Sequence, residues 1–464
     1  MVQKQSKKRG KKPPATANDM PVIRPDVAGI DIGSRSHWVA VPADRDEDPV
    51  REFSSFTGGL NELAAWLKSC RVKSVAMEST GVYWIPLYEL LEQQGFEVLL
   101  VNAAHVRNVP GRKSDVLDCQ WIQRLHSVGL LRGSVRPEAQ YIELRAYVRQ
   151  RERLVQDAAR YVQHMQKALM EMNVQVHHVV SDLAGVTGMR IVRAIVKGEH
   201  DGEKLAELRD GRCRQPKERI AEALQGTYKR EHLFVLEQAL EAYDLQQRML
   251  VACDARIEAL LAEIAADNPE PSEPCPPPRF GRPTNNQPTF EVQQPLYRIC
   301  KGVDLTLIHG IAPATALRIL SEIGTDVSRW KTDKHFTSWL CLAPGTKITG
   351  GKRLSGRRPP TQNRVGQALR QCAVAVGRTE TALGAFYRRL AARIGAAKAA
   401  VATARKLGVL IYRALKHGQA FVETGLALYE KQQQDRQVRN LQKRAAALGF
   451  QLLPVPAEPA AAAG

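Results

Sequence analysis

The sequence lacks long apolar runs and paired cysteines. No stretch of its 464 residues approaches the roughly 18 consecutive apolar residues of a membrane-spanning helix. The N-terminus has no apolar signal core, so export is not expected. The eight cysteines are scattered without a CxxC pair. They predict reduced thiols in a cytoplasmic protein and argue against a zinc site.

Acidic residues are outnumbered by basic ones. Asp and Glu together number 48, against 67 Lys and Arg, so the formal net charge is +19. This surplus predicts a polyanionic partner, most simply nucleic acid, although a membrane surface could also attract it. Residues 1–25 are rich in Lys, Arg and Pro and, like residues 451–464, are expected to be a disordered tail.

Residues 26–136 have the pattern of an α/β domain. Short apolar runs predict strands, and amphipathic runs predict helices. The order is three strands, helix, strand, helix, strand, helix. The strands are expected at 27–33, 37–43, 51–56, 72–79 and 96–102, and the helices at 58–70, 83–95 and from 114 onward.

The last of these helices carries two carboxylates directly after a basic loop. Ser114 is a candidate N-cap, and Asp115 and Asp118 share one face of the helix, one turn apart. The loop before them contains Arg107, Arg112 and Lys113. Acids beside bases suit a metal ion held against a phosphate backbone. Alternatively, acids in a first turn only complement the helix dipole.

Two further acids lie in apolar strands. Asp31 is flanked by Ile30 and Ile32, and Glu78 ends the 72–79 strand. A carboxylate there is costly to bury unless it is paired or binds a metal. Together with Asp115 and Asp118, these acids could hold Mg²⁺, and two ions would suit phosphodiester chemistry. The alternative is that both are polar residues at a sheet edge.

The pattern becomes helical after residue 136. Heptad seams run through 141–172 and 233–264, broken by Arg151 in the first and by Gln247 and Asp254 in the second. They predict a helical hairpin or an oligomerisation coiled coil, with a plain bundle core as the alternative. Residues 137–266 are therefore assigned to one helical region, with shorter helices between the seams.

Residues 267–295 are rich in Pro and predict a linker. A second helical domain follows at 296–450, with helices expected at 363–376, 379–394, 396–417 and 420–449. Residues 305–324 have two apolar stretches around Gly310 and resemble a helix-hairpin-helix, whose turn offers backbone amides to a phosphate. A simple helix–helix turn is the alternative.

A basic loop without acids spans Pro344 to Pro360. Its bases are Lys347, Lys352, Arg353, Arg357 and Arg358. Gly350 and Gly351 would permit close approach of the backbone to a partner. Such a loop suits a phosphate backbone, and a solvated basic turn is the alternative.

Three segments carry a family resemblance: GIDIGSRSHWVAV, AMESTGVYW and VNAAHVRNVPGRKSDVLDCQW. They resemble the RuvC-like domain of DEDD transposases of the insertion sequence 110 family, closest to its 1111 group. The resemblance implies an RNase H-like (RuvC-like) α/β domain, long coiled-coil helices that make residues 137–266 a dimerisation region, and an all-α C-terminal transposase domain. It assigns metal binding to Asp31, Glu78, Asp115 and Asp118.

The resemblance also implies an activity. It predicts a metal-dependent DNA recombinase, guided by a noncoding bridge RNA and working as a dimer or tetramer in the bacterial cytoplasm at the nucleoid. The family's nucleophilic serine stands just before Gly-Gly-Lys. This chain has Thr349 there, whose hydroxyl is chemically competent, and Ser355 is a weaker substitute. The alternatives are a junction-resolvase-like nuclease using water, or a catalytically silent nucleic-acid-binding relative.

Overall fold

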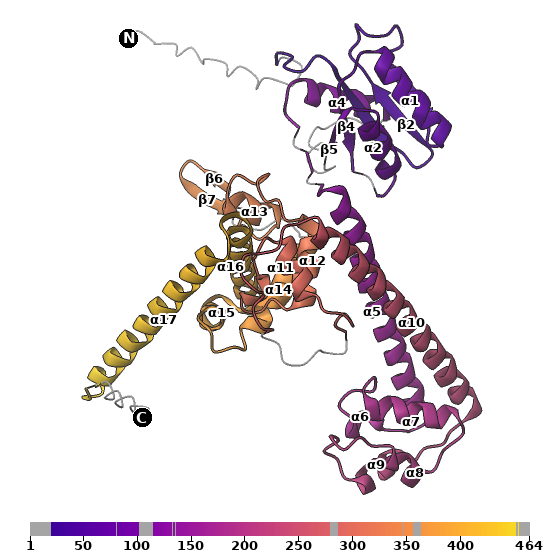
Figure 1. Ribbon diagram of the computed structural model, residues 1–464, viewed down its shortest axis with the longest axis vertical. Helices are drawn as coiled ribbons and strands as arrows, with labels where there is room; N and C mark the ends of the chain where they lie inside the picture. The colour runs from indigo at the N-terminus through magenta and orange to yellow at the C-terminus, as the bar shows by residue number, and fades with distance from the viewer. Residues whose placement is uncertain are drawn as a thin grey trace, which may run out of the picture. The chain divides into compact units, whose positions relative to one another are not determined.

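The computed structural model describes residues 20–451 and 453, except for residues 80, 102–114, 132, 135, 279–285, 346 and 356–362. The chain divides into two compact units, residues 1–136 and 137–464 (Figure 1). In the described part of the chain, no helix combines the length and the apolar character needed to cross a membrane. All eight cysteines are free thiols.

The first unit is built on a five-stranded mixed sheet with the order β3-β2-β1-β4-β5 (Figure 1). β1 pairs antiparallel with β2 and parallel with β4, and β5 is parallel to β4. The strands are β1 (Val27–Ile32), β2 (Ser36–Ala40), β3 (Val50–Ser54), β4 (Ser74–Glu78) and β5 (Glu97–Val101). The expected order of strands and helices is confirmed.

Helices cover both faces of this sheet. α1 (Thr57–Ser69) and α2 (Trp84–Gln93) share a buried core with residues such as Ile30 and Met77. α4 (Asp115–Ser127) contributes Ile122 to a second core with Ala76 and Val101. Because successive strand residues point to opposite faces, these two cores lie on opposite sides of the sheet.

The second unit contains a hairpin of two long helices, α5 (Ala139–Glu171) and α10 (Arg230–Ala266), which run side by side (Figure 1). Many residues of the expected heptad seams are buried along it: Leu144, Val148, Met165, Leu236, Ile257 and Leu261. Within one chain, the two seams thus pair as a helical hairpin. Four shorter helices lie between them: α6 (Val176–Val179), α7 (Val186–Val196), α8 (Gly202–Glu207) and α9 (Lys217–Ala223).

Two of the polar residues that interrupt the seams bind each other. Arg151 Nε donates to Asp254 Oδ1 at 2.5 Å, and Asp254 is only 2% exposed. Asp254 also accepts hydrogen bonds from the backbone N–H and the hydroxyl of Thr289, and Arg151 donates to the carbonyl of Asn286. The ion pair therefore fastens part of the Pro-rich segment to the hairpin.

The remaining helices follow this segment. They are α11 (Gln293–Ile299), the 3-10 turn η2 (Leu305–Leu307), α12 (Pro313–Ile323), α13 (Asp333–Trp339), α14 (Arg364–Val376), α15 (Ala382–Ile394), α16 (Ala396–His417) and α17 (Gln419–Ala447). α12 packs on α5, where Arg149 donates two 2.7 Å hydrogen bonds to Glu322. The four helices expected after residue 363 are present.

The stretch at 305–324 differs from its expected form. Its first half is a single 3-10 turn, so the pair of α-helices that the pattern favoured does not form. Gly310 has φ +90°, and a Cβ there would collide with the Val376 side chain of α14. The glycine is therefore explained by turn conformation and close packing, without a phosphate.

We expect the buried Arg151–Asp254 pair to have a large effect on stability when one partner is removed. Asp254→Leu should lower the free energy of unfolding by about 3–5 kcal/mol, because it leaves the guanidinium buried without its counter-charge. The double variant Arg151→Met/Asp254→Leu should recover most of the loss. Urea unfolding followed by far-UV circular dichroism measures both.

The matched control is Arg193→Met, which breaks the more exposed Arg193–Asp244 pair. Its expected cost is at most about 1 kcal/mol. An Asp254→Leu variant as stable as this control would contradict a structural role for the buried pair.

Candidate active site

Asp31 and Glu78 lie side by side at the carboxyl ends of two neighbouring parallel strands. The β1–β4 register pairs Ile30 with Met77, so the two acids occupy the next position. Adjacent strands are separated by about 4.8 Å. Both side chains are half-buried.

Both acids project from the face of the sheet that α4 covers. Gly29, two residues before Asp31, touches the α4 backbone. Ala76, two residues before Glu78, shares a core with Ile122 of α4. Because side chains alternate along a strand, Asp31 and Glu78 point to this same face.

Contacts along α4 fix its direction. His126, near its C-terminus, forms a 2.8 Å hydrogen bond with Ser74 at the start of β4, and Ile122 packs near Ala76. Four helical residues rise about 6.0 Å and two strand residues about 6.6 Å, so helix and strand stay in step. The sequence Ser74, Ala76, Glu78 along β4 is therefore matched by His126, Ile122, Asp118 along α4. Asp118 thus lies at the level of the two strand acids.

Gly29 sets the distance between β1 and α4. A Cβ at this position would overlap the backbone of both Cys119 and Gln123. A glycine within a strand often marks such a close backbone approach. Here it lets the helix that carries Asp118 lie directly against the strand that carries Asp31.

The charges of Asp31 and Asp118 both affect the pKa of the buried Cys119 thiol. Burial, together with the charges of Asp31 and Asp118, raises the pKa of Cys119 to about 12. Two elements thus bring negative charge near one buried thiol. Carboxylates in one neighbourhood are the oxygen ligands that hard divalent cations prefer.

The fourth predicted acid, Asp115, is the first residue of α4, one helical turn before Asp118. Its side chain lies outside the described residues. Among the described side chains, no three His, Cys, Asp or Glu come close enough to hold a metal ion together. The four predicted ligands, which are Asp31, Glu78, Asp115 and Asp118, would all donate carboxylate oxygens. Oxygen donors suit a hard divalent cation more than zinc.

The predicted nucleophile stands in the second unit, on a two-stranded hairpin of β6 (Lys347–Thr349) and β7 (Lys352–Ser355). The expected loop is thus partly a β-hairpin. Gly350 and Gly351 have φ +55° and +76°, as a two-residue hairpin turn of this kind requires. The turn conformation therefore explains why both positions are glycine. Thr349 is exposed beside this turn.

The side chains of all eight predicted phosphate-binding bases lie outside the part of the chain that the structure describes. Lys347, Lys352 and Arg353 are positioned in the hairpin by their backbones alone. The other five lie outside the described residues: Arg107, Arg112, Lys113, Arg357 and Arg358.

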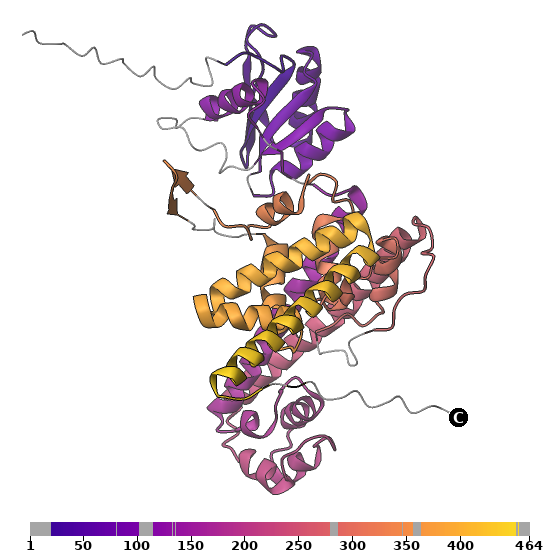
Figure 2. The same ribbon diagram turned by 90° about the vertical axis from the view of Figure 1, so that its left-hand side faces the viewer.

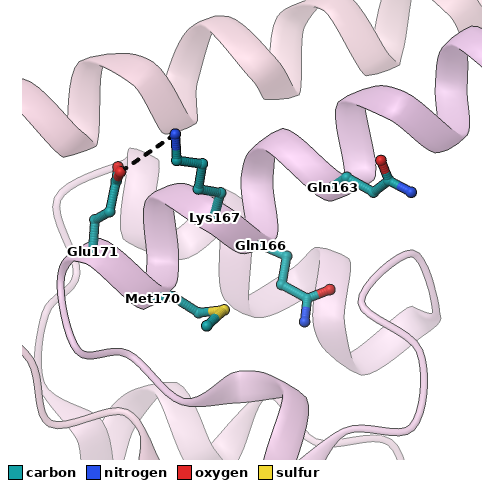
Figure 3. Close-up of a pocket in the computed structure, with 5 residues that line it drawn as sticks. All are labelled: Gln163, Gln166, Lys167, Met170 and Glu171. Atoms are coloured by element: carbon teal, nitrogen blue, oxygen red, sulfur yellow. Dashed lines mark ion pairs between the residues drawn. The ribbon is translucent and has the colours of Figure 1, made fainter.

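A surface hollow on α5 lies elsewhere and has a different character. It encloses about 440 Å³ and is lined by Gln163, Gln166, Lys167, Met170 and Glu171 (Figure 3). All five residues come from one helix, and Lys167 and Glu171 form an ion pair at 3.7 Å. The hollow is therefore a groove along a helix surface, without a catalytic constellation.

Residues that position the acids were missed by reasoning from sequence alone. Gly29, Ser74, Cys119 and His126 hold α4 on the sheet. Only Gly29 carried a usable signal, because a glycine between apolar strand residues indicates close backbone approach. The Ser74–His126 pair joins residues 52 positions apart, which no local pattern reveals.

Two transposase family models match the chain. Residues 28–174 match the DEDD transposase model of the IS110 family, and residues 304–388 match the model described as the transposase IS116/IS110/IS902 family. No curated protein matches the sequence.

The first match covers most of the unit that carries the carboxylates and continues into α5 of the second unit, and the second match includes the hairpin that carries Thr349. The chain is thus an enzyme of the transposase/recombinase class, whose partner is DNA. It belongs to the IS110 family of transposases.

Gly29→Ala should test the approach of α4 to β1. The added methyl group meets backbone on α4, so we expect a loss of about 2–3 kcal/mol in stability and loss of DNA cleavage. Gly58→Ala is the matched control, since nothing lies within 4 Å of its Cβ position. Thermal unfolding and a cleavage assay measure the effects, and identical behaviour of the two variants would refute this role of Gly29.

His126 should make the first unit sensitive to mild acid. Burial lowers its pKa to about 4, so the folded ring stays neutral where the unfolded chain, with a pKa near 6.5, binds a proton. Its contribution to stability is complete above pH 6.5 and falls by about 1.4 kcal/mol per pH unit toward pH 4. Urea unfolding across this range should show a shallower dependence for His126→Gln. Equal slopes would exclude His126 as the cause.

Proposed function

We propose that this transposase cuts and exchanges DNA strands at a site formed by Asp31, Glu78, Asp115 and Asp118. The observation that carries the proposal is the register of β1 and β4, which sets Asp31 beside Glu78 on the face that bears α4. The strand order, with an antiparallel meander followed by two parallel strands, supports an RNase H-like fold for this unit.

These four carboxylates would hold a divalent cation, for which Mg²⁺ is the first candidate because all donors are hard oxygens. When bound, such an ion stabilises the negative charge that develops on the scissile phosphate. Asp31 and Glu78 would supply ligands from the sheet and Asp118 from the helix, with Asp115 one turn away. Gly29 and the Ser74–His126 hydrogen bond would act by positioning.

Thr349 is the proposed nucleophile. Its hydroxyl oxygen would form a bond to the scissile phosphorus, and the bond from phosphorus to the 3′ oxygen would break. The hydroxyl proton ends on the departing 3′ oxygen, directly or through a base. The resulting protein–DNA ester conserves the phosphodiester energy, so the free 3′ hydroxyl of another strand can reverse the step. The exposure of Thr349 beside a tight turn supports this role.

The finer parts of the proposal concern partners. The bases around Thr349 and before α4 would contact phosphates, and a structured noncoding bridge RNA would select the sequence. Two or four subunits would assemble through the α5–α10 region as a coiled coil, so that the carboxylates of one subunit work with Thr349 of another.

A nuclease that uses water is the second candidate. It is favoured by the location of all four carboxylates within one compact unit, where they could act without Thr349.

A trapping experiment separates the two functions. Wild-type protein, copurifying RNA, Mg²⁺ and labelled element-end DNA are mixed, denatured and resolved on a gel. We expect a covalent adduct that Thr349→Ala and Asp118→Asn both abolish, that Thr349→Ser retains and that EDTA prevents.

Each other result has a definite meaning. Cleaved DNA without adduct, unchanged in Thr349→Ala, would refute the covalent step and establish the nuclease. An adduct that persists in Asp118→Asn would refute the role of the carboxylates. DNA binding with neither adduct nor cleavage would indicate a silent binder.

A further inference from the structure

The helices α15, α16 and α17 form a strongly basic part of the chain. Residues 382–447 contain 13 Lys and Arg but only 3 Asp and Glu, a surplus of ten charges out of 19 for the whole chain. The three helices contact one another, and Figure 2 shows them in orange and yellow along one side of the second unit. A surplus this concentrated needs counter-charge from a partner.

The charges gather around one aromatic ring. Phe386 of α15 is half-buried, and Lys406 of α16 places its Nζ 4.7 Å from the ring centroid. Arg389 of α15 places its Cζ 5.7 Å from the same centroid. Cations at these distances are attracted to the ring face. The ring thus helps to hold two positive charges close together.

A third cation reaches the cluster from α17. Burial lowers the pKa of Lys406, and the nearby charges of Arg389 and Arg436 lower it further. Arg389 also donates a 3.4 Å hydrogen bond to Gln433 of α17, which ties the two helices together. Three like charges from three helices therefore repel one another in the folded protein.

A neighbouring base of α16 is neutralised, unlike Arg389 and Arg436. Arg413 of α16 is paired with Asp333 at 2.8 Å. Within the described residues, neither Arg389 nor Arg436 forms an ion pair with a carboxylate. The two exposed arginines thus keep their charge available to an external anion.

The basic face continues along α17. Arg436, Arg439 and Lys443 are all exposed and stand at positions i, i+3 and i+7, so they share one side of the helix. A row of cations on a helix matches a chain of phosphates better than a single small anion.

We propose that the cluster of Arg389, Lys406 and Arg436, extended by the basic side of α17, binds the phosphate backbone of duplex DNA. The inference rests on the DNA partner of the transposase and adds a surface distinct from the residues assigned to strand cleavage. It involves no contact with base edges, so binding here depends on salt and not on sequence.

The test measures binding, which separates it from the covalent mechanism at Thr349. Fluorescence anisotropy follows full-length protein on a labelled duplex of arbitrary sequence between 0.05 and 0.3 M salt, values chosen around the roughly 0.1 M range in which such contacts respond. Arg389→Gln/Lys406→Gln/Arg436→Gln should weaken binding more than about tenfold. Its plot of log affinity against log salt should be shallower by about 2.7, or 0.9 for each lost contact.

The matched control is Arg193→Gln/Arg212→Gln/Arg219→Gln, which removes the same net charge from exposed arginines that are already paired with Asp244, Asp210 and Glu222. It should leave the slope unchanged. Far-UV circular dichroism checks that both variants fold.

Three results would overturn the proposal. The first is a cluster variant that folds and binds duplex like the control. The second is weaker binding with an unchanged salt slope. The third is a loss confined to a structured RNA probe measured in parallel, which would assign the surface to RNA and not to DNA.

Discussion

The contact between β1 and α4 at Gly29 is the constraint on which the candidate active site depends. A strand and a helix can approach until their backbones touch only if no side chain intervenes, and glycine meets that condition. Four helical residues rise nearly as far as two strand residues, and the Ser74–His126 hydrogen bond fixes the starting point. The helix and the strand therefore remain aligned up to the end of the sheet. These contacts place Asp118 toward the end of the sheet at which Asp31 and Glu78 lie.

In the second unit a buried ion pair fixes how two elements pack, as Gly29 does in the first unit. Arg151 and Asp254 interrupt apolar seams, and each would be costly in a core on its own. Together they satisfy each other and also hold Thr289 and Asn286, so the hairpin of long helices gains a defined register and a defined place for the following segment. The hairpin with Thr349 is held more locally, by a two-glycine turn.

Charge is distributed unevenly along the chain. The four proposed metal-binding carboxylates belong to the first unit, whereas α15–α17 carry a strongly basic surface that is apart in sequence from the bases around Thr349. The proposed phosphate-binding face and the proposed cation site would do opposite electrostatic work, so substitutions on α15–α17 should change affinity for DNA without removing the carboxylates.

The sequence by itself determined the order of strands and helices, the location of Asp31, Glu78, Asp115 and Asp118, and the family. Periodicity is local, and the motifs surrounding these acids are contiguous. Only the tertiary structure decided that Arg151 meets Asp254, that residues 305–307 are one 3-10 turn and that a hairpin bears Thr349. It also decided that bases from three helices gather around Lys406. Each of these features depends on contacts between residues far apart in the chain or on the local backbone conformation. The periodicity of apolar residues reveals neither of these two factors.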